Sequence, residues 1–454
     1  MRSSFRDPNG FLFERQGRLL RQVTEVGRAD FEAVRASGVP ARLMDDGLLI
    51  PHVELAVTEA ATADAAYVLA PERIPFVSYP WEWTFGQLRD AARLTLRIQQ
   101  VALQQGLTLR DASAFNIQWR GSRPVLVDTL SLGVRRPGSP WVAYQQFCRH
   151  FLAPLALMAY TDVRLRDLWR SYLDGIPLDL ASRLLPRHTW LMPWALIHIH
   201  LHARSVGRHA SRPAPDVARH RGVSDRGIDG LVDHLAGAVE SRRWTPPSSE
   251  WGDYDTTHGY DPATLEAKQA VVRAALERHR PRVVWDLGAN TGRFSRLAQA
   301  AGAYVVAPDG DAGAVERHYV ALRAADAERT LPLWTDLRNP GPAQGWAHEE
   351  RMSLVSRGPA DMILALALVH HLAIGNNLPL EAIVTFIKSI GRRVAVEWIP
   401  KEDPQVRRLL AARDDIFPHY TRSHFEAALQ REFVLERSEH LTGSGRALLV
   451  AVRR

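Results

Sequence analysis

The sequence predicts an α/β protein in which a doubly wound parallel sheet forms the carboxyl-terminal half and an α+β domain precedes it. Three observations lead to this prediction. From residue 251 onward, apolar runs of strand length alternate with helical patterns, which is typical of a parallel sheet with helical crossovers. A turn with two glycines follows the first of these strands, where such sheets usually bind a ligand. The length of 454 residues suits two or three domains.

The spacing of apolar residues predicts each element of the carboxyl-terminal half. Apolar side chains at helical spacing indicate helices, and short unbroken apolar runs indicate buried strands. The predicted helices span 263–279, 293–301 and 312–326. The predicted strands span 283–286, 304–307, 331–334, 361–366 and 393–398. Two further strands, 433–438 and 447–452, are expected to close the sheet as a hairpin.

Composition divides the chain into three regions. Residues 1–203 are rich in Trp, Leu, Arg and Pro, with helical patterns over 84–106 and 141–160. Residues 204–250 carry Pro, Ser and Gly at both ends and are predicted to be a linker, with a short helix inside it because apolar residues from Ile228 to Val239 recur at helical spacing. Residues 251–454 form the predicted sheet domain.

The overall composition excludes several classes of protein. With 46% hydrophobic and 24% charged residues the chain is globular, neither disordered nor collagen-like. Its single cysteine, Cys148, excludes an internal disulfide and a cysteine-based zinc site, and it suits a reducing compartment. There is no apolar run of 18 residues and no signal-like amino terminus, so we expect a soluble, cytoplasmic protein without a membrane partner.

The net charge of +7 raises the question of a nucleic-acid partner. Lysine occurs only at Lys268, Lys388 and Lys401, and arginine supplies the remaining cations, a bias that a GC-rich genome also produces. Acidic residues lie among the arginines throughout, and no basic block stands clear of them. Charge alone therefore leaves nucleic acid as an alternative partner and does not favour it.

The turn after the first predicted strand of the sheet reads Asp286-Leu-Gly-Ala-Asn-Thr-Gly292. Gly288 allows a sharp bend and a close approach of the ligand, and Gly292 allows the next helix to begin close to the sheet. A dinucleotide site would be expected to show Gly-x-Gly-x-x-Gly. An acid at the head of the turn would repel a pyrophosphate and attract an ammonium group.

This turn resembles the first motif of class I S-adenosylmethionine-dependent methyltransferases, Asp/Glu-x-Gly-x-x-x-Gly, at every fixed position. The resemblance covers about 251–454 and implies a Rossmann-like fold with S-adenosylmethionine as cofactor. It further implies that the backbone from Gly288 to Asn290 faces the cofactor's carboxylate and that Asp286 lies near its ammonium group.

Two later acids match the same family. The end of the second strand, Ala307-Pro-Asp309, matches the acid that binds the ribose hydroxyls, while Asp311 falls beyond the strand end and is a weaker match. Asp336 and Leu337, after the third strand, resemble the adenine site. The cofactor-binding residues that the resemblance implies are Asp286, Gly288, Ala289, Asn290, Thr291, Gly292, Asp309, Gly310, Asp336, Leu337 and Ala365.

The methyl acceptor is expected beside the loop after the fourth strand, which contains His370 and His371. Either histidine would suit the deprotonation of a hydroxyl or amine, or would simply pack or cap the next helix. Glu397, at the end of the fifth strand, is a further candidate for base or binding group, with pairing to an arginine as the alternative. The loop lacks the Asn/Asp-Pro-Pro-Tyr/Phe tetrapeptide of base-amine methyltransferases. Trp251 and Tyr254, before the first helix of this half, are candidates for a lid over the cofactor or for an aromatic anchor of the linker.

The first half resembles a degenerate protein kinase or aminoglycoside phosphotransferase. Asp111, Asn116 and Asp128 match the acceptor-orienting Asp and the two magnesium ligands of those enzymes. No lysine precedes Lys268 and no glycine-rich loop is present, so only an arginine could contact the phosphates. The resemblance implies a domain that recognises the acceptor or maintains the enzyme's shape.

His198, His200 and His202 form a cluster that suggests a metal site, but no third ligand stands at a fixed spacing, so packing is the favoured interpretation and no metal is predicted. The whole layout loosely resembles bacterial nodulation-related methyltransferases. The sequence therefore predicts methyl transfer from S-adenosylmethionine to an oxygen or nitrogen atom, most simply of a small molecule. The alternatives are an RNA methyltransferase with the first half as a clamp, and a phosphotransferase or nucleotide-binding regulator fused to a methyltransferase.

Overall fold

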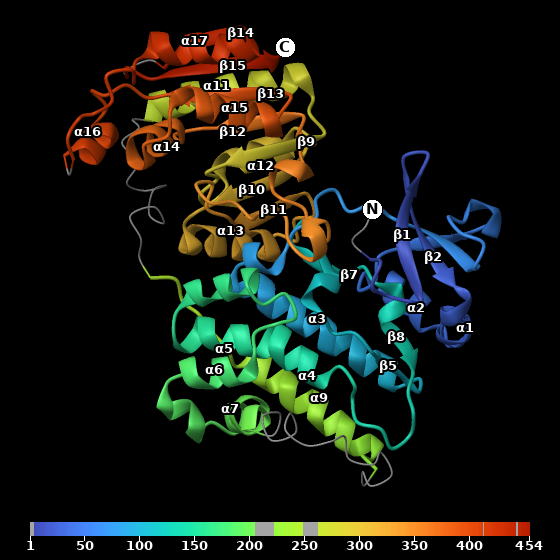
Figure 1. The fold of residues 1–454 in the computed structure, drawn as a ribbon. Helices are drawn as coiled ribbons and strands as arrows, with labels where there is room; N and C mark the ends of the chain where they lie inside the picture. The colour runs from blue at the N-terminus through green and yellow to red at the C-terminus, as the bar shows by residue number, and fades with distance from the viewer. Residues whose placement is uncertain (1–3, 205–221, 248–261, 412, 442–443) are drawn as a thin grey trace. The chain divides into compact units, whose positions relative to one another are not determined.

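The computed structural model describes residues 4–204, 222–247, 262–411, 413–441 and 444–454, and Figure 1 shows their fold. The chain divides into two compact units, which are described separately. The first unit comprises Met1–Trp119, Pro124–Thr245 and Gln344–Arg351. The second comprises Arg120–Arg123, Pro246–Ala343 and Met352–Arg454. Trp251 and Tyr254 lie outside the described residues.

The second unit contains a seven-stranded sheet with the order β11-β10-β9-β12-β13-β15-β14. Its strands are β9 (Val283–Leu287), β10 (Tyr304–Asp309), β11 (Thr330–Trp334), β12 (Met362–Ala365), β13 (Arg393–Trp398), β14 (Phe433–His440) and β15 (Ala447–Arg453). The strands from β9 to β13 pair in parallel, and β15 pairs antiparallel with both β13 and β14. The predicted doubly wound sheet with a closing hairpin is therefore confirmed.

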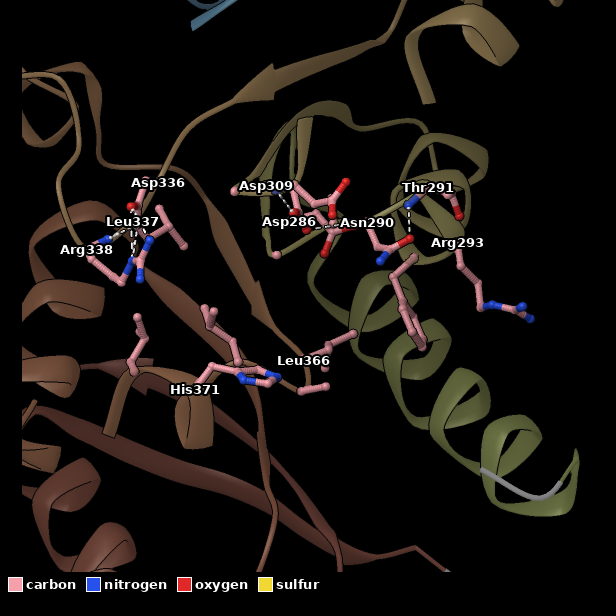
Figure 2. A pocket seen from close by; sticks show the side chains of 18 of the residues that line it. Asp286, Asn290, Thr291, Arg293, Asp309, Asp336, Leu337, Arg338, Leu366 and His371 are labelled. Atoms are coloured by element: carbon pink, nitrogen blue, oxygen red, sulfur yellow. Dashed lines mark hydrogen bonds and ion pairs between the residues drawn. The ribbon is translucent and has the colours of Figure 1, made fainter. Parts of the chain in front are cut away.

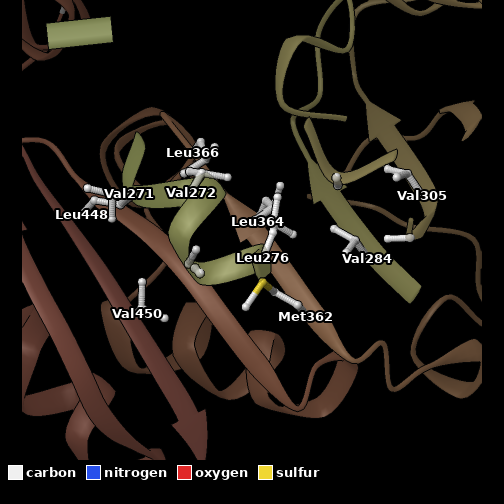
Figure 3. Close-up of a cluster of buried hydrophobic side chains, with 14 of the residues drawn as sticks. Val271, Val272, Leu276, Val284, Val305, Met362, Leu364, Leu366, Leu448 and Val450 are labelled. Carbon is white, nitrogen blue, oxygen red and sulfur yellow. The ribbon is translucent and has the colours of Figure 1, made fainter. Parts of the chain in front are cut away.

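Helices cover both faces of this sheet. They are α11 (Pro262–His279), α12 (Arg293–Ala300), α13 (Ala312–Ala324), α14 (Val369–Asn376), α15 (Leu380–Ile390), α16 (Pro404–Leu410) and α17 (Arg422–Glu432). On one face, Val272 and Leu276 of α11 join a buried apolar cluster with Val284, Leu364 and Val450 of the strands (Figure 3). On the opposite face, the Trp398 ring of β13 stacks on Phe425 of α17, with 5.4 Å between ring centroids.

The strand order determines where a ligand can bind. The chain runs from β9 outward through β10 to β11 and then returns to the other side of β9 at β12. The sheet therefore has a switch point between β9 and β12, and the loops that leave the strands there diverge and open a crevice beyond the carboxyl ends. The turn at Gly288 and the predicted acids Asp309 and Asp336 all lie at or just beyond these carboxyl ends.

The first unit begins with a four-stranded antiparallel sheet in the order β1-β2-β4-β3. Its strands are β1 (Gly10–Arg15), β2 (Arg18–Thr24), β3 (His52–Leu55) and β4 (Ala65–Pro71), and two short pairs follow, β5 (Leu107–Leu109) with β8 (Leu132–Val134) and β6 (Ile117–Arg120) with β7 (Arg123–Leu126). The helices are α1 (Arg28–Ala36), α2 (Val39–Asp45), α3 (Phe85–Leu103), α4 (Tyr144–Phe147), α5 (Ala153–Tyr160), α6 (Leu178–Leu184), α7 (Pro193–Ala195) and α9 (Asp225–Glu240). Thr84 caps α3, because its side chain accepts a hydrogen bond from the Gln87 N–H.

One helix expected in the first unit differs from the structure, and another agrees with it. The helix expected over 141–160 is interrupted, since a π-helical segment (Cys148–Leu152) separates α4 from α5. The helix predicted inside the linker from the spacing of Ile228 to Val239 is present as α9. It packs on α3 within the first unit, where Gln100 of α3 donates a hydrogen bond to Asp233 at 3.0 Å. The boundary between units at Thr245 lies near the end of that predicted linker. Within the described residues, no helix is long and apolar enough to cross a membrane.

Candidate functional site

A pocket of ≈ 400 Å³ opens at the carboxyl edge of the sheet in the second unit (Figure 2). Four loops line it, those that follow β9, β10, β11 and β12, together with residues of α11 and α14. Figure 2 shows Asp336 and Leu337 at one end, Asp286 and Asp309 in the middle, and Arg293 at the other end. Segments far apart in the sequence thus contribute to one cavity, as the switch point of the sheet requires.

The turn after β9 has a backbone that favours glycine. Gly288 has a φ of 73°, Asn290 of 51° and Gly292 of 83°, all in the left-handed region. A Cβ on Gly288 would lie 3.6 Å from Leu368, so its absence widens the pocket. A Cβ on Gly292 would lie 2.0 Å from Nε2 of His318. Gly288 therefore leaves room for a ligand, whereas Gly292 leaves room for a buried histidine.

The Asp309 carboxylate is fixed in the middle of the pocket by two backbone groups. Asn290 N–H donates to its Oδ2 at 2.8 Å, and Asp311 N–H donates to its Oδ1 at 2.8 Å. Burial raises the pKa of Asp309, and these backbone hydrogen bonds oppose the rise. Asp311 also lines the pocket, but its Oδ1 accepts from Ala314 N–H and caps α13. Asp309 is thus positioned to accept hydrogen bonds from a ligand, while Asp311 is committed to the helix.

Asp286 lies deeper, at the end of β9. Only 2% of it is exposed, and the Ser295 hydroxyl donates to its Oδ2 at 2.6 Å. Burial raises the pKa of this carboxyl group to about 6, while the Ser295 hydrogen bond and the Lys268 ammonium lower it. A cation bound beside this carboxylate would favour its ionised form and lower that pKa.

The end of the pocket beyond β11 is lined by Asp336, Leu337 and Arg338. The Arg338 guanidinium pairs with the Asp336 carboxylate at 2.7 Å and also donates to Asn376 of α14 at 3.2 Å. More than half of the Arg338 side chain is exposed. Asp336, which is predicted to bind the adenine amine, is therefore already paired with an arginine at the surface of the pocket.

The loop after β12 forms the wall opposite the turn at Gly288. Leu366, Ala367 and Leu368 line the pocket, whereas the predicted residue Ala365 is fully buried inside β12. Ala367 has a φ of 51°, which is uncommon for a residue with a Cβ. Its N–H donates to Oε2 of Glu397 at 2.8 Å. A buried carboxylate thus stabilises the shape of this loop.

The two candidate histidines occupy different positions. His371 lines the pocket, and its ring lies 4.0 Å from the ring of His370. His370 is buried, its Nδ1 has no hydrogen-bond partner, and burial holds its pKa well below the ordinary value, so the ring is neutral. Of the pair, His371 is the one in contact with the cavity.

Glu397 does not line the pocket and is fully buried. Its Oε2 lies 2.7 Å from Nζ of Lys268, its Oε1 lies 3.6 Å from Arg446, and Arg446 pairs with Asp403 at 2.7 Å. Lys268, on α11, does line the pocket, although it is not among the site residues predicted from the sequence. The sequence does place this lysine on the buried face of the predicted helix, because Lys268 lies three and four residues before the apolar Val271 and Val272.

Some of the predicted cofactor and catalytic residues line the pocket, and the others lie directly behind the lining residues. The lining residues among the predictions are Asp286, Gly288, Ala289, Asn290, Thr291, Asp309, Gly310, Asp336, Leu337 and His371. The predicted residues outside the lining are Gly292, Ala365, His370 and Glu397. Each of these four directly adjoins a lining residue in the chain or through a hydrogen bond.

The kinase-like residues of the first unit form a closed network. Asp128 pairs with Arg21 of β2 and accepts from the Ser131 hydroxyl at 2.7 Å. Asn116 donates to the same hydroxyl at 3.2 Å, and Asp111 accepts from Gln146 at 2.7 Å. Burial raises the pKa of Asp111. A guanidinium is therefore the cation beside Asp128, and the phosphotransferase resemblance stays a prediction.

The clustered histidines His198 and His200 form hydrogen bonds with neighbouring side chains. His198 bonds to the Tyr144 hydroxyl at 2.7 Å and to His234 at 2.8 Å. His200 lies between the Ser182 and Thr189 hydroxyls, at 2.7 and 2.9 Å, and stacks on an indole ring. In the part of the chain that the structure describes, no group of three or more His, Cys, Asp or Glu residues is arranged to hold a metal ion.

Comparison with known proteins identifies one full-length relative. The nodulation protein NoeA of Rhizobium meliloti (strain 1021) is 34% identical over 451 residues, which cover 98% of this chain and 94% of that protein. No protein-family model matches the chain.

Solved structures match only part of the chain. The magnesium protoporphyrin IX methyltransferase ChlM from Synechocystis PCC 6803, with bound SAH, is 20% identical over 42% of this chain and 84% of that one, with a TM-score of 0.31. The N-methyltransferase NodS from Bradyrhizobium japonicum WM9 is 10% identical over 42% of this chain and 98% of that one, with a TM-score of 0.32. The bifunctional kinase-methyltransferase WbdD is 15% identical over 44% of this chain and 41% of that one, with a TM-score of 0.30. At these values the matches say nothing about what this chain binds.

Proposed function

Because this chain belongs to the family of the nodulation protein NoeA and its sheet ends in a pocket lined by acids, we propose that it is an S-adenosylmethionine-dependent methyltransferase. We further propose that the methyl group goes to an oxygen or nitrogen atom of a small acceptor. One observation carries the proposal. The glycine turn after β9 and the carboxylates after β10 and β11 line a single cavity in the order that the three parts of the cofactor require.

The chemistry of the lining fits this cofactor. Ribose hydroxyls and the adenine amine are hydrogen-bond donors, and Asp309 and Asp336 offer acceptors at two successive positions of the pocket. Asp286 offers a buried carboxylate to the ammonium group. The bare backbone of Gly288 leaves the space that a Cβ would take between the turn and Leu368. The hydrogen-bond acceptors and charges of the cavity are thus complementary to the donors and charges of the cofactor.

When bound, S-adenosylmethionine supplies a methyl group on a sulfonium, which needs no further activation. The protein then has to exclude water, align the acceptor and receive its proton. Leu366, Leu368 and Leu372 give the wall beside α14 an apolar surface that excludes water. His371 lies in the same wall and is the group that we assign to take the acceptor's proton.

His370 and Glu397 support the site in this proposal. The neutral ring of His370 packs against His371 and limits the positions that the His371 ring can take. Glu397 holds the N–H of Ala367, so the loop beside the acceptor keeps its left-handed residue. Neither side chain lines the cavity, and both act through a neighbour that does.

Calorimetry with S-adenosylhomocysteine tests the cofactor. Asp309→Asn should weaken binding about 10- to 100-fold, because it removes a charged acceptor. Asp311→Asn is a matched control, since Asp311 lines the same pocket, and Asn caps a helix as well as Asp does. Equal losses in the two variants would reject the ribose assignment, and no binding to the wild-type chain would reject the function.

The acceptor class needs a separate experiment. Lysate incubated with the enzyme and cofactor carrying a labelled methyl group is separated into small molecules, RNA and protein. The proposal expects the label among small molecules. Label in RNA that falls with added salt would favour the RNA methyltransferase instead.

A further inference from the structure

Lys268 is a cation inside the wall of the pocket. Only 3% of its side chain is exposed, yet it lines the cavity together with Asp286, Gly288 and Phe294. Its ammonium lies 4.8 Å from the centre of the Phe294 ring. The other cationic side chains that line the described pocket, Arg293 and Arg338, are more exposed. A buried lysine at a ligand pocket calls for an explanation, because burial of an ammonium is costly.

The position of Lys268 is fixed from two sides. On its own helix, Val271 and Val272 pack in the apolar cluster on the sheet, so one face of α11 is anchored there (Figure 3). From the sheet, Glu397 reaches the ammonium at 2.7 Å. Glu397 lies two residues after Ala395, which belongs to the same cluster, and therefore points to the same face of the sheet. The ammonium is held at the cavity with little freedom to move.

The charged groups around the Lys268 ammonium bear on which part of a ligand it would contact. Burial lowers the pKa of Lys268, and attraction to Glu397 and Asp286 opposes that change. Glu397 alone would neutralise the lysine for a purely structural purpose. A lysine in a purely structural pair does not need to line a cavity, however, and Lys268 does so next to Gly288, where the turn presents its backbone to the ligand.

We propose that Lys268 binds the carboxylate of the amino-acid part of S-adenosylmethionine, with Glu397 as the residue that positions its ammonium. This inference rests on the proposed function. It assigns Asp286 and Lys268 to opposite charges of the same amino-acid group, with the carboxylate of Asp286 facing the ligand's ammonium. The chain would then select for a cofactor that carries an intact carboxylate.

The test compares two ligands by calorimetry, S-adenosylhomocysteine and its decarboxylated analogue, which lacks only the carboxylate. Wild-type chain should prefer S-adenosylhomocysteine about 10- to 100-fold, the effect of one charged hydrogen bond. Lys268→Met should lose that preference by binding S-adenosylhomocysteine more weakly while it binds the analogue as before. Lys388→Met, which breaks a pair with Glu432 at the surface, should behave like wild type.

Two results would overturn the inference. One is an equal loss of affinity for both ligands in Lys268→Met, which would mean that the lysine only maintains the fold. The other is a wild-type chain that binds both ligands equally well. If Lys268→Met does not fold, Lys268→Met with Glu397→Gln removes both charges together and is compared in the same way. A wild-type chain that binds neither ligand would instead reject the proposed function.

Discussion

Replacement of Gly292 by alanine gives a sharp test of how the glycine turn is built. Gly292 has a φ of 83°, and a Cβ added there would lie 2.0 Å from Nε2 and 2.3 Å from Cε1 of His318. His318 is 1% exposed, so its ring has no free space to move into. Alanine is therefore opposed both by its backbone conformation and by a steric clash.

The two contributions are separable. A left-handed alanine costs about 1–2 kcal/mol, and overpacking of a buried site costs about 1–3 kcal/mol. Gly292→Ala should thus lose about 2–5 kcal/mol of local stability. Gly302, in the turn after α12, has a φ of 91° and no heavy atom within 4 Å of an added Cβ. Gly302→Ala carries the backbone cost alone, about 1–2 kcal/mol.

Hydrogen–deuterium exchange of the peptides that cover β9 and α12 measures the loss of stability locally, which suits a chain with two units. Gly292→Ala should speed exchange well beyond Gly302→Ala. The double variant Gly292→Ala with His318→Ala should lose less than the sum of the two single variants, because the clash disappears with the ring. Equal effects of Gly292→Ala and Gly302→Ala, or simple additivity in the double variant, would refute the reasoning.

Three more predictions follow from the described contacts. The pKa of Asp286 is about 6, and only its ionised carboxylate can pair with an ammonium group. The affinity for S-adenosylhomocysteine, measured by calorimetry, should therefore rise up to tenfold per pH unit below about pH 6 and level off above it. Asp286→Asn should remove this pH dependence. Glu397→Gln removes the shared anionic partner of two buried cations and should lower the free energy of opening of β13, measured by hydrogen exchange, by about 3–5 kcal/mol. Glu432→Gln, which breaks a surface pair, should lower it by about 0–1 kcal/mol. Similar costs in the two variants would contradict this. Arg21→Met leaves Asp128 without its cation and should speed exchange at β2 while S-adenosylhomocysteine affinity stays unchanged; a large loss of affinity would show that the two units are coupled.

The sheet could be predicted because its central strands are buried on both faces. Consecutive apolar residues run through the middle of these strands, as at Val283–Trp285 and Val394–Val396, which is typical of a strand covered by helices. The interruption between α4 and α5 could not be predicted in the same way. A π-helical segment shifts the phase of the helix without changing its composition, and Cys148, His150, Phe151 and Leu152 are all buried, so no exposed face marks the shift.

The site could be predicted only as far as strand ends and turns indicate it. Asp309 is the last residue of β10 and Asp336 lies two residues after the end of β11, so their place at the carboxyl edge follows from strand order. Glu397 also lies near the end of a strand, but the sequence does not say which face of the sheet it points to, and its pairing with Lys268 depends on that face. Lys268 lies in a helix that precedes the sheet, where one charged residue on an apolar face is easily taken for a solvent-exposed side chain.

Glu397 accepts through the same oxygen from the Ala367 N–H and from the Lys268 ammonium. The first contact lies on the acceptor side of the proposed reaction and the second on the donor side. Because one oxygen serves both contacts, a displacement of the Glu397 carboxylate changes its distance to the Ala367 N–H and to the Lys268 ammonium together. The loop after β12 and helix α11 are therefore linked through a single buried atom.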